Sequence, residues 1–337
     1  MKKIFYLLII LTLVSALLMI SYTNSKLSEY PAFSDTVTVN IAKNSNVDQI
    51  VTKFNEYDLL TPDWLFSNYI KFIMKKDGKG VFAGNYDITP TTSNDEIIDM
   101  ILTGGYASTL SITIPEGLNN SEIAEILESK LGIDKFKFLR LTKSDSLLSE
   151  WNIKANNTIG YLLPETYDFY GDEDETQAID KLLKHHQDIW TSDNEQKLKE
   201  SGLTKHELLT IASIVQAETP LDSELETVAG LYLNRVKIGM LLQADPTVQF
   251  ALGNKKRLLY KDLEYDSPYN TYKYAGIPPG PINNPGKAAI LATLNPAEHD
   301  FLYMVAYGDG SGAHYFAKTV REHNNNVIKY KKARGRL

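Results

Sequence analysis

The segment LLTIASIVQAETP, residues 208–220, predicts an apolar helix that ends in a carboxylate, Glu218. At 100° per residue, Leu208, Ile211 and Val215 share one face of the helix, and Glu218 falls on the same stripe. A charge there is costly to desolvate unless it is paired, or unless its pKa rises and it holds a proton. Glu218 is therefore our candidate acid or base. The alternative is that the helix surfaces at its last turn and Glu218 reaches water.

Further side chains that could bind a substrate follow in two short segments, LLQADPTV and YNTY. The candidates are Gln243, Asp245, Thr247, Tyr269, Asn270 and Tyr272. Tyrosine rings can stack on the apolar faces of sugars, while the polar groups can bind hydroxyls. Two alternatives stay open. Asp245, which precedes a proline, could instead form a turn or cap a helix, and both tyrosines could be core residues.

The composition argues against several other kinds of site. The chain of 337 residues has a net charge of −7, so it lacks the basic footprint of a nucleic-acid-binding protein. It contains no cysteine, which excludes disulfides, thiol nucleophiles and thiolate metal sites. Its six histidines show no metal-ligand spacing. We therefore expect neither a metal nor another cofactor.

The N-terminus predicts a single membrane-spanning anchor. Lys2 and Lys3 precede an uncharged, mostly apolar run from Ile4 to Tyr22, which at about 1.5 Å per residue spans about 28 Å, close to the thickness of the bilayer core. A cleavable signal peptide is the competing interpretation, but its apolar region is shorter, and SYTNSK lacks a small-residue cleavage site. The lysines favour a cytoplasmic N-terminus, with the body of the chain from about residue 23 outside the membrane.

A pattern of strand, polar turn and amphipathic helix occurs three times, in residues 39–54, 87–102 and 112–127. Isoleucines occupy the equivalent position of each helix: Ile50, Ile97 and Ile123. Asp, Ser or Asn before each helix predicts an N-cap. Residues 61–76 predict a separate helix between the first two copies.

The helices around Glu218 are predicted from residues that cap or end helices. Thr204 and Glu207 form a capping box that begins its helix, and Pro220 ends it. A second helix over 225–238 has an apolar stripe, which we expect to be packed: Val228, Leu231, Tyr232 and Val236. Residues 191–202 predict a solvated turn or connector.

The last hundred residues are rich in turn-forming residues interleaved with tyrosines, which favours loops that build a site. FLYMVAY and AHYFAKT flank GDGSG and predict a hairpin. We expect His314, in the second of these segments, to be a hairpin residue rather than a catalyst.

Several long motifs in the same order resemble the endolytic murein transglycosylases of the MltG/YceG-like family. They are IASIVQAET, LYLNRVKIGMLLQADPTVQFALG, SPYNTYKYAGIPPGPINNPG, HYFAKTVREHN and GYLLPETYDF. The resemblance runs from about residue 36 to 325. Where many members of the family read VEKET, this chain reads VQAET, so Gln216 and Ala217 replace a carboxylate and a lysine.

The resemblance implies cleavage between N-acetylmuramic acid and N-acetylglucosamine inside peptidoglycan strands, leaving 1,6-anhydro ends. It maps the family's catalytic glutamate onto Glu218. Such chemistry needs a single carboxylate, acting as acid and then as base, whereas a two-carboxylate glycosidase needs a second acid. An apolar setting would keep Glu218 protonated for the acid step. We expect Gln243, Asp245, Asn270 and Tyr272 to position the sugar, and a groove floored by the loops of residues 243–285.

Residues 36–105 also resemble a LysM-like module, a fold that binds N-acetylglucosamine-containing glycans. A small spacer without sugar affinity is the alternative. The predicted fold class is α+β, with an N-terminal transmembrane helix, the LysM-like module and a C-terminal mixed α+β catalytic domain. The predicted boundaries are 1–22 for the cytoplasmic stub and anchor, 23–35 for a linker, 36–105 for the module, 106–158 for a connecting segment and 159–337 for the catalytic domain.

Two rival functions remain at this point. Asp245 could be the second acid of a lysozyme-like hydrolase, or the chain could be a non-catalytic, membrane-anchored wall-binding protein. The expected partners are peptidoglycan strands and the membrane, with glycan-polymerising synthases as further candidates because a strand-cutting enzyme could limit or terminate the elongation of nascent strands.

Overall fold

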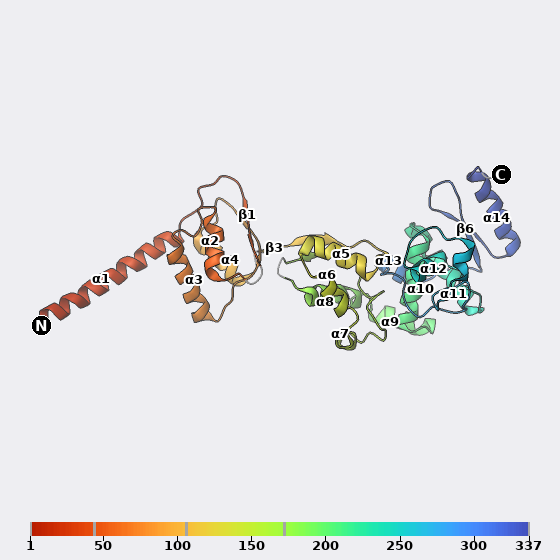
Figure 1. Ribbon diagram of the computed structural model, residues 1–337, viewed down its shortest axis with the longest axis horizontal. Coiled ribbons are helices and arrows are strands. Elements are labelled where there is room, and N and C mark those ends of the chain that lie inside the picture. Colours follow the sequence, from red (N-terminus) through yellow and green to blue (C-terminus); the bar gives the residue numbers. More distant parts are fainter. Residues whose placement is uncertain (1, 43–44, 105–106, 171–172, 336–337) are drawn as a thin grey trace. The chain divides into compact units, whose positions relative to one another are not determined.

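The computed structural model describes residues 2–42, 45–104, 107–170 and 173–335, and the chain divides into two compact units (Figure 1). The first unit contains Met1–Ser111 with Asp168–Glu173, and the second contains Ile112–Tyr167 with Asp174–Leu337. Helices and short sheets occur in both units. The predicted α+β class is therefore confirmed.

The first unit begins with the apolar helix α1 (Lys2–Leu27). Within the described residues, it is the one helix long and apolar enough to cross a membrane, and it is a candidate membrane span. The helix continues beyond residue 22, and Leu27 is buried in the core of this unit. Asn94 fixes the end of the helix, because its Nδ2 donates a hydrogen bond to the Lys26 carbonyl at 2.9 Å and its backbone N–H donates to the Glu29 carbonyl at 3.0 Å.

The rest of the first unit is a small three-stranded sheet with three helices. Its further elements are β1 (Val37–Ile41), α2 (Val47–Asn55), α3 (Asp63–Asp77), β2 (Gly84–Ile88), α4 (Asn94–Thr103) and β3 (Ala107–Ser108). The sheet order is β1-β2-β3, and β1 pairs antiparallel with β2 so that Val37 lies opposite Ile88. The observed order β1-α2-α3-β2 is the strand, helix, helix, strand order that the sequence predicts.

The three predicted helix starts are confirmed as capping boxes. The N-cap residues are Asn46, Ser93 and Asn119, and their partners three residues on are Gln49, Glu96 and Glu122. The equivalent isoleucines are all buried: Ile50, Ile97 and Ile123. Each cap satisfies amides that the first helical turn leaves free, and the isoleucine one residue after the box partner enters the core.

The second unit holds most of the helices and two two-stranded sheets. Its elements before Glu218 are β4 (Leu110–Thr113, which begins in the first unit), α5 (Asn120–Leu131), α6 (Lys135–Leu141), α7 (Asp145–Glu150), β5 (Thr166–Phe169, which ends in the first unit), α8 (Glu175–Gln187), α9 (Ser192–Ser201) and α10 (Lys205–Glu218). After Glu218 come the 3₁₀ helix η1 (Asp222–Glu224), α11 (Leu225–Lys237), α12 (Asp245–Leu252), η2 (Tyr260–Glu264), α13 (Lys287–Leu294), β6 (Tyr303–Ala306), β7 (His314–Ala317) and α14 (Val320–Ala333).

The core that positions the candidate site is built on α10, α11 and α13. Ile211, Ile214 and Val215 of α10 pack in one apolar cluster with Val228 of α11 and Ala289 of α13. All five side chains are completely buried. Because α10 is held on both sides, the residue at its C-terminal end has a fixed position.

Two sequence predictions about the second unit have different outcomes. The hairpin is confirmed, since β6 and β7 pair antiparallel and bring Ala306 opposite His314. The solvated turn or connector predicted over residues 191–202 is solvent-exposed but is not a turn, because Ser192–Ser201 form α9, capped by Thr191 and ended by Gly202 in the left-handed conformation. No residue of α9 is buried, and its sequence therefore lacks the regular spacing of apolar residues that marks an amphipathic helix.

Candidate active site

Helix α10 delivers Glu218 to the position that its sequence predicts. Thr204 accepts a hydrogen bond from the Glu207 backbone, the Glu207 side chain accepts one back, and this capping box begins the helix. Residues 208–215 are all buried. Glu218 is the last helical residue and is partly buried, because Thr219 is already extended and Pro220 follows. The carboxylate therefore belongs to the last residue of the helix, where the chain leaves the core.

Among the residues that the structure describes, Glu218 has one hydrogen-bond donor, and that donor is a neutral hydroxyl. The Tyr232 hydroxyl, from α11, donates to Glu218 Oε1 at 2.8 Å. Desolvation raises the pKa of Glu218 to about 7, and the charge of Asp245 adds to the rise, while the Tyr232 hydrogen bond and the Arg235 charge oppose it. Near neutral pH, Glu218 therefore exists both as an acid and as a base.

A second polar pair lies close enough to act on Glu218 electrostatically. The Tyr272 hydroxyl donates to Asp245 Oδ1 at 2.6 Å. Burial raises the pKa of Tyr272, and the carboxylates of Asp245 and Glu218 raise it further, so the tyrosine stays protonated. Asp245 is the first residue of α12 and is exposed to solvent. Three of the predicted residues thus belong to one electrostatic cluster.

Arg235 is a member of this cluster that the sequence analysis missed. It lies on α11 and is buried, with its Nε donating to the Leu302 carbonyl at 2.7 Å and its Nη1 to the Leu242 carbonyl at 2.5 Å. Its charge lowers the pKa of Glu218 and of Tyr272. The sequence did contain a signal for Arg235, because it is a basic residue within the apolar stripe of α11. Charged residues are rarely buried unless they are paired or functional.

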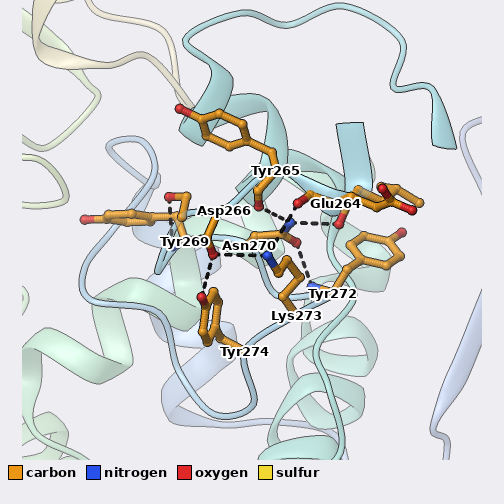
Figure 2. A network of polar contacts seen from close by, with 10 residues as sticks. Glu264, Tyr265, Asp266, Tyr269, Asn270, Tyr272, Lys273 and Tyr274 are labelled. Atoms are coloured by element: carbon orange, nitrogen blue, oxygen red, sulfur yellow. Dashed lines mark hydrogen bonds and ion pairs between the residues drawn. The ribbon is translucent and has the colours of Figure 1, made fainter. Parts of the chain in front are cut away.

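Asn270 organises the loop that carries the candidate tyrosines (Figure 2). It is fully buried, and its Nδ2 donates to the carbonyls of Leu263 and Tyr265 at 2.8 and 2.7 Å. Its Oδ1 accepts from the Tyr272 backbone N–H at 3.0 Å. Figure 2 shows the rings of Tyr269 and Tyr272 on opposite sides of this amide. Asn270 therefore fixes the backbone from which Tyr272 reaches Asp245.

The remaining predicted residues differ in exposure. Thr247 is fully buried, and its hydroxyl bonds to the Ala244 carbonyl at 2.7 Å and to the Thr271 hydroxyl at 2.9 Å. Gln243 is exposed and has a positive φ of 47°. Tyr269 is partly buried, and its ring packs 4.8 Å from that of Phe250. Gln243 and Tyr269 present side chains to solvent, whereas Thr247 supports the start of α12.

A cavity of about 710 Å³, the α10 cavity, borders the end of this helix. Gln216 and Ala217 line it, together with Pro246 and Phe250 of α12. Asn283 also lines it, and although this side chain is only 6% exposed, its Oδ1 has no hydrogen-bond partner. Asn283 is thus an acceptor that sequence reasoning missed; its Nδ2 bonds to the Ser213 carbonyl at 2.8 Å.

Gln216, which departs from the family pattern, has a structural contact. Its Oε1 accepts a hydrogen bond from the Gly286 backbone N–H at 2.9 Å. A carboxylate at this position could accept the same bond, so the contact does not require a charge. Ala217 is exposed and leaves the wall of the α10 cavity without a basic group at that point.

On the other side of Pro220, Glu224 joins the hairpin to the segment that follows Glu218. Its carboxylate accepts from His314 Nδ1 at 2.7 Å, from the His314 backbone N–H at 2.8 Å and from the Thr219 hydroxyl at 3.3 Å. His314 opens β7 and contacts Glu224, which agrees with its prediction as a hairpin residue. Across the described ranges, no three or more His, Asp or Glu side chains gather in a way that could hold a metal ion.

Comparisons with known proteins show which proteins this chain is similar to. The profile of the YceG-like family matches residues 39–329. A protein of Bacillus subtilis (strain 168) named endolytic murein transglycosylase is 31% identical over 310 residues, covering 88% of this chain and 85% of that protein. A Streptococcus pneumoniae serotype 2 (strain D39) protein of the same name is 29% identical over 87% of this chain and 58% of its own length.

A solved structure has the same fold. The crystal structure of a putative yceG-like protein from Listeria monocytogenes superimposes with a TM-score of 0.60 at 32% sequence identity. The match covers 86% of this chain and 98% of that protein. Sequence and structure thus agree over most of the chain, and the protein belongs to the YceG-like family.

Proposed function

We propose that this protein is a membrane-anchored, endolytic peptidoglycan lytic transglycosylase with Glu218 as its catalytic residue. The observation that carries the proposal is the setting of Glu218 at the end of a buried helix, where desolvation raises its pKa to about 7. A glycosidic bond needs a proton donor near neutral pH, and this carboxyl can be one. The relatives named endolytic murein transglycosylase support the choice of peptidoglycan as the substrate.

The reaction requires Glu218 in two successive roles. Protonated Glu218 gives its proton to the glycosidic oxygen as the bond from C1 of N-acetylmuramic acid to that oxygen breaks. The resulting carboxylate takes the proton of the C6 hydroxyl of the same sugar, and the C6 oxygen forms the new bond to C1. The products are a 1,6-anhydro end and a free N-acetylglucosamine end, and no water is consumed. The attacking group is already part of the substrate, which replaces a positioned water.

The other polar residues are proposed to hold the strand. Gln243, Asp245, Tyr269 and Tyr272 have side chains at or near the surface and would contact sugar hydroxyls and ring faces. Thr247 and Asn270 are buried and would act through the backbone that they fix. The free Asn283 Oδ1 in the α10 cavity offers an acceptor for an amide or hydroxyl donor of the sugar.

The lysozyme-like alternative would use Asp245 as a second acid. Its charge acts on Glu218, which is the observation in its favour. However, the Tyr272 hydroxyl already holds Asp245 at 2.6 Å. The single-carboxylate mechanism gives Asp245 a simpler task, which is to raise the pKa of Glu218 and to position Tyr272.

The first unit is proposed to be a LysM-like glycan-binding module beside the anchor. A hollow of about 470 Å³ lies where β1 leads into α2, lined by Asn40, Ser45, Gln49 and Lys53 among others. These side chains offer donors and acceptors for a sugar. Lys2 and Lys3 favour a cytoplasmic N-terminus, so the body would act outside the membrane and could limit strand elongation beside glycan-polymerising synthases.

Product analysis tests this proposal. The full-length protein is incubated with purified sacculi, and the soluble muropeptides are weighed by mass spectrometry. Anhydromuropeptides are expected, whereas hydrolysis would add the mass of one water to each product. Reducing-end products alone would establish the two-carboxylate alternative. Retention of sacculi without any product would favour a wall-binding protein.

A further inference from the structure

Three neighbouring hollows in the second unit share lining residues, each with the next, and we call this series the track. The α10 cavity shares Asn157 and Ile159 with a hollow of about 250 Å³. That hollow shares Lys154 and His206 with a third, of about 640 Å³. The track therefore runs, hollow by hollow, from Ala217, the residue before Glu218, to Lys205 at the opposite end of the same helix. With 14 residues in α10, its two ends lie about 20 Å apart.

The third hollow, here called the far pocket, has aromatic walls. Trp151 follows α7, Tyr161 precedes β5 and Trp190 follows α8, and all three line the pocket. Tyr161 is held in place, because its hydroxyl bonds to His206 Nδ1 at 2.9 Å and His206 Nε2 donates to the Pro279 carbonyl at 2.9 Å. Fixed aromatic walls of this kind suit a ligand with an apolar or amide body.

The far pocket also contains a cation without a matching anion. The Lys205 ammonium lies 4.2 Å from the centre of the Trp190 ring, and the side chain is partly buried. Burial lowers the pKa of Lys205, and although the Glu195 carboxylate opposes this, the two form no ion pair in the described part of the chain. Glu207, the other acidic residue of the lining, is engaged in the capping box of α10.

Two further polar groups in the pocket walls have unmade hydrogen bonds. His186 is 5% exposed and Trp190 is 8% exposed, and in each ring one nitrogen, His186 Nε2 and Trp190 Nε1, has no partner. Leaving a buried polar group unpaired costs about 1–3 kcal/mol. The Trp190 indole and the Lys205 ammonium can only donate, so a ligand that satisfies them must bring acceptors.

We propose that the far pocket binds the carboxylate end of a stem peptide on the peptidoglycan strand being cut. This inference rests on the proposed function for the identity of the substrate. The sugars of the strand are amides and alcohols, and the free carboxylates are carried by the peptide stems. An extended peptide of about five residues spans about 17 Å. The lactyl group that joins the stem to muramic acid adds about the length of one more residue, which gives about 20 Å in all. A stem attached to the muramic acid beside Glu218 can therefore extend along the track and place its carboxylate at Lys205.

The first test separates stem recognition from bond cleavage. Strands with intact stems and the same strands stripped of stems by an amidase are digested by full-length wild type, Lys205→Gln and Lys199→Gln. Lys199 is an exposed lysine of α9 outside the pocket, which makes it the matched control. Lys205→Gln is expected to lower kcat/KM about tenfold on intact strands and to leave stripped strands within about twofold, while the control changes neither.

The outcomes distinguish this inference from the proposed function. An equal loss on both substrates, or no loss on either, overturns stem recognition by Lys205. If the wild type cuts neither substrate, the proposed function itself fails. The urea midpoint of Lys205→Gln is measured alongside, so that an equal loss counts against stem recognition when the variant folds like the wild type.

The second test measures binding directly. The probe is an acetylated peptide that ends in D-alanyl-D-alanine, as the free acid and as the C-terminal amide. Trp151 and Trp190 line the pocket, so tryptophan fluorescence of the full chain should report binding. The acid is expected to bind at least about tenfold more tightly than the amide, and Trp190→Phe should remove most of the signal. Equal affinity for acid and amide, or a signal unchanged by Trp190→Phe, overturns the proposal.

Discussion

Two glutamates flank the same turn, six positions apart in sequence, and the structure places them in opposite settings. Glu218 ends α10 with a single hydrogen bond, from the neutral hydroxyl of Tyr232. Glu224 lies in η1 and accepts hydrogen bonds from the Thr219 hydroxyl and from both the backbone and the ring of His314. Both carboxylates are partly buried. The difference between them is the number and kind of their donors.

This difference fits the catalytic role that we propose for Glu218 and a structural role for Glu224. The Glu224 carboxylate is engaged by three donors and ties the hairpin to the turn, which is a structural task. A carboxylate that is desolvated against one neutral hydroxyl is held between its two forms. The turn thus carries the proposed proton donor at one end and, at the other, a carboxylate that anchors the hairpin.

The largest expected effect is on catalysis, from Glu218→Gln. The substitution keeps the shape and an acceptor for Tyr232 but cannot donate an acid proton. Release of anhydromuropeptides from sacculi should fall about 10²–10⁴-fold, the range typical of a lost general acid. Glu226→Gln, an exposed glutamate of α11, is the matched control and should retain wild-type rates. Wild-type turnover by Glu218→Gln would remove Glu218 from the mechanism.

Next is a loss of stability, from Glu224→Gln. The replacement puts an amide group against His314 and removes the charge from a pair whose side chains are only 12–13% exposed. Breaking such a pair should lower the free energy of unfolding by about 2–3 kcal/mol. Urea unfolding of this variant against Glu226→Gln measures the difference. Equal midpoints for the two variants would mean that the hairpin does not depend on Glu224.

Local signals in the sequence were enough to place Glu218. The capping box of Thr204 and Glu207 and the stop at Pro220 depend only on neighbouring residues, and both ends of α10 lie where they predict. The same holds for the repeated caps and for the hairpin. Helix α9 was missed because the prediction relied on apolar periodicity, although Thr191 and Gly202 bracket it with cap signals.

The partners of Glu218 could not be predicted, because tertiary packing alone brings them together. Tyr232 looks like any apolar-stripe residue of α11, and nothing in the sequence indicates that its hydroxyl reaches Glu218. Glu224 and His314 are separated by 90 positions. Asn270 was predicted to touch the substrate because its type and neighbours suit a sugar, whereas its buried hydrogen bonds favour a role in holding the loop.

Glu218→Gln is expected to raise stability, by less than Glu224→Gln lowers it. The pKa of Glu218 is raised from 4.5 to about 7 on folding, so the folded state binds this proton more tightly than the unfolded chain. Stability therefore falls as pH rises from about 4.5 to about 7, and the cost is fully present above that. One unit of pKa difference between the folded and unfolded states corresponds to about 1.4 kcal/mol, so the loss of stability has an upper bound of about 3 kcal/mol.

Because glutamine does not titrate, Glu218→Gln should be more stable than the wild type by about 1–2 kcal/mol at pH 8 and equal to it near pH 4. Urea unfolding at the two pH values measures this. A variant that is less stable than the wild type at pH 8 would place Glu218 with Glu224 as a structural carboxylate and would remove the contrast between them.

The smallest expected effects are shifts of the alkaline limb of the kcat/KM profile, where Glu218 loses its proton. Tyr232→Phe removes a hydrogen bond that lowers the pKa of Glu218, so the limb should move to higher pH. The free energy of one hydrogen bond, about 1 kcal/mol, corresponds to a shift of somewhat less than about one pH unit. Asp245→Asn removes a charge that raises that pKa, so the limb should move to lower pH. Shifts in opposite directions would show that Tyr232 and Asp245 both act on the proton of Glu218. Shifts in one direction would mean that the limb belongs to another group, because no single titrating carboxyl at position 218 can respond to a lost donor and a lost like charge in the same sense.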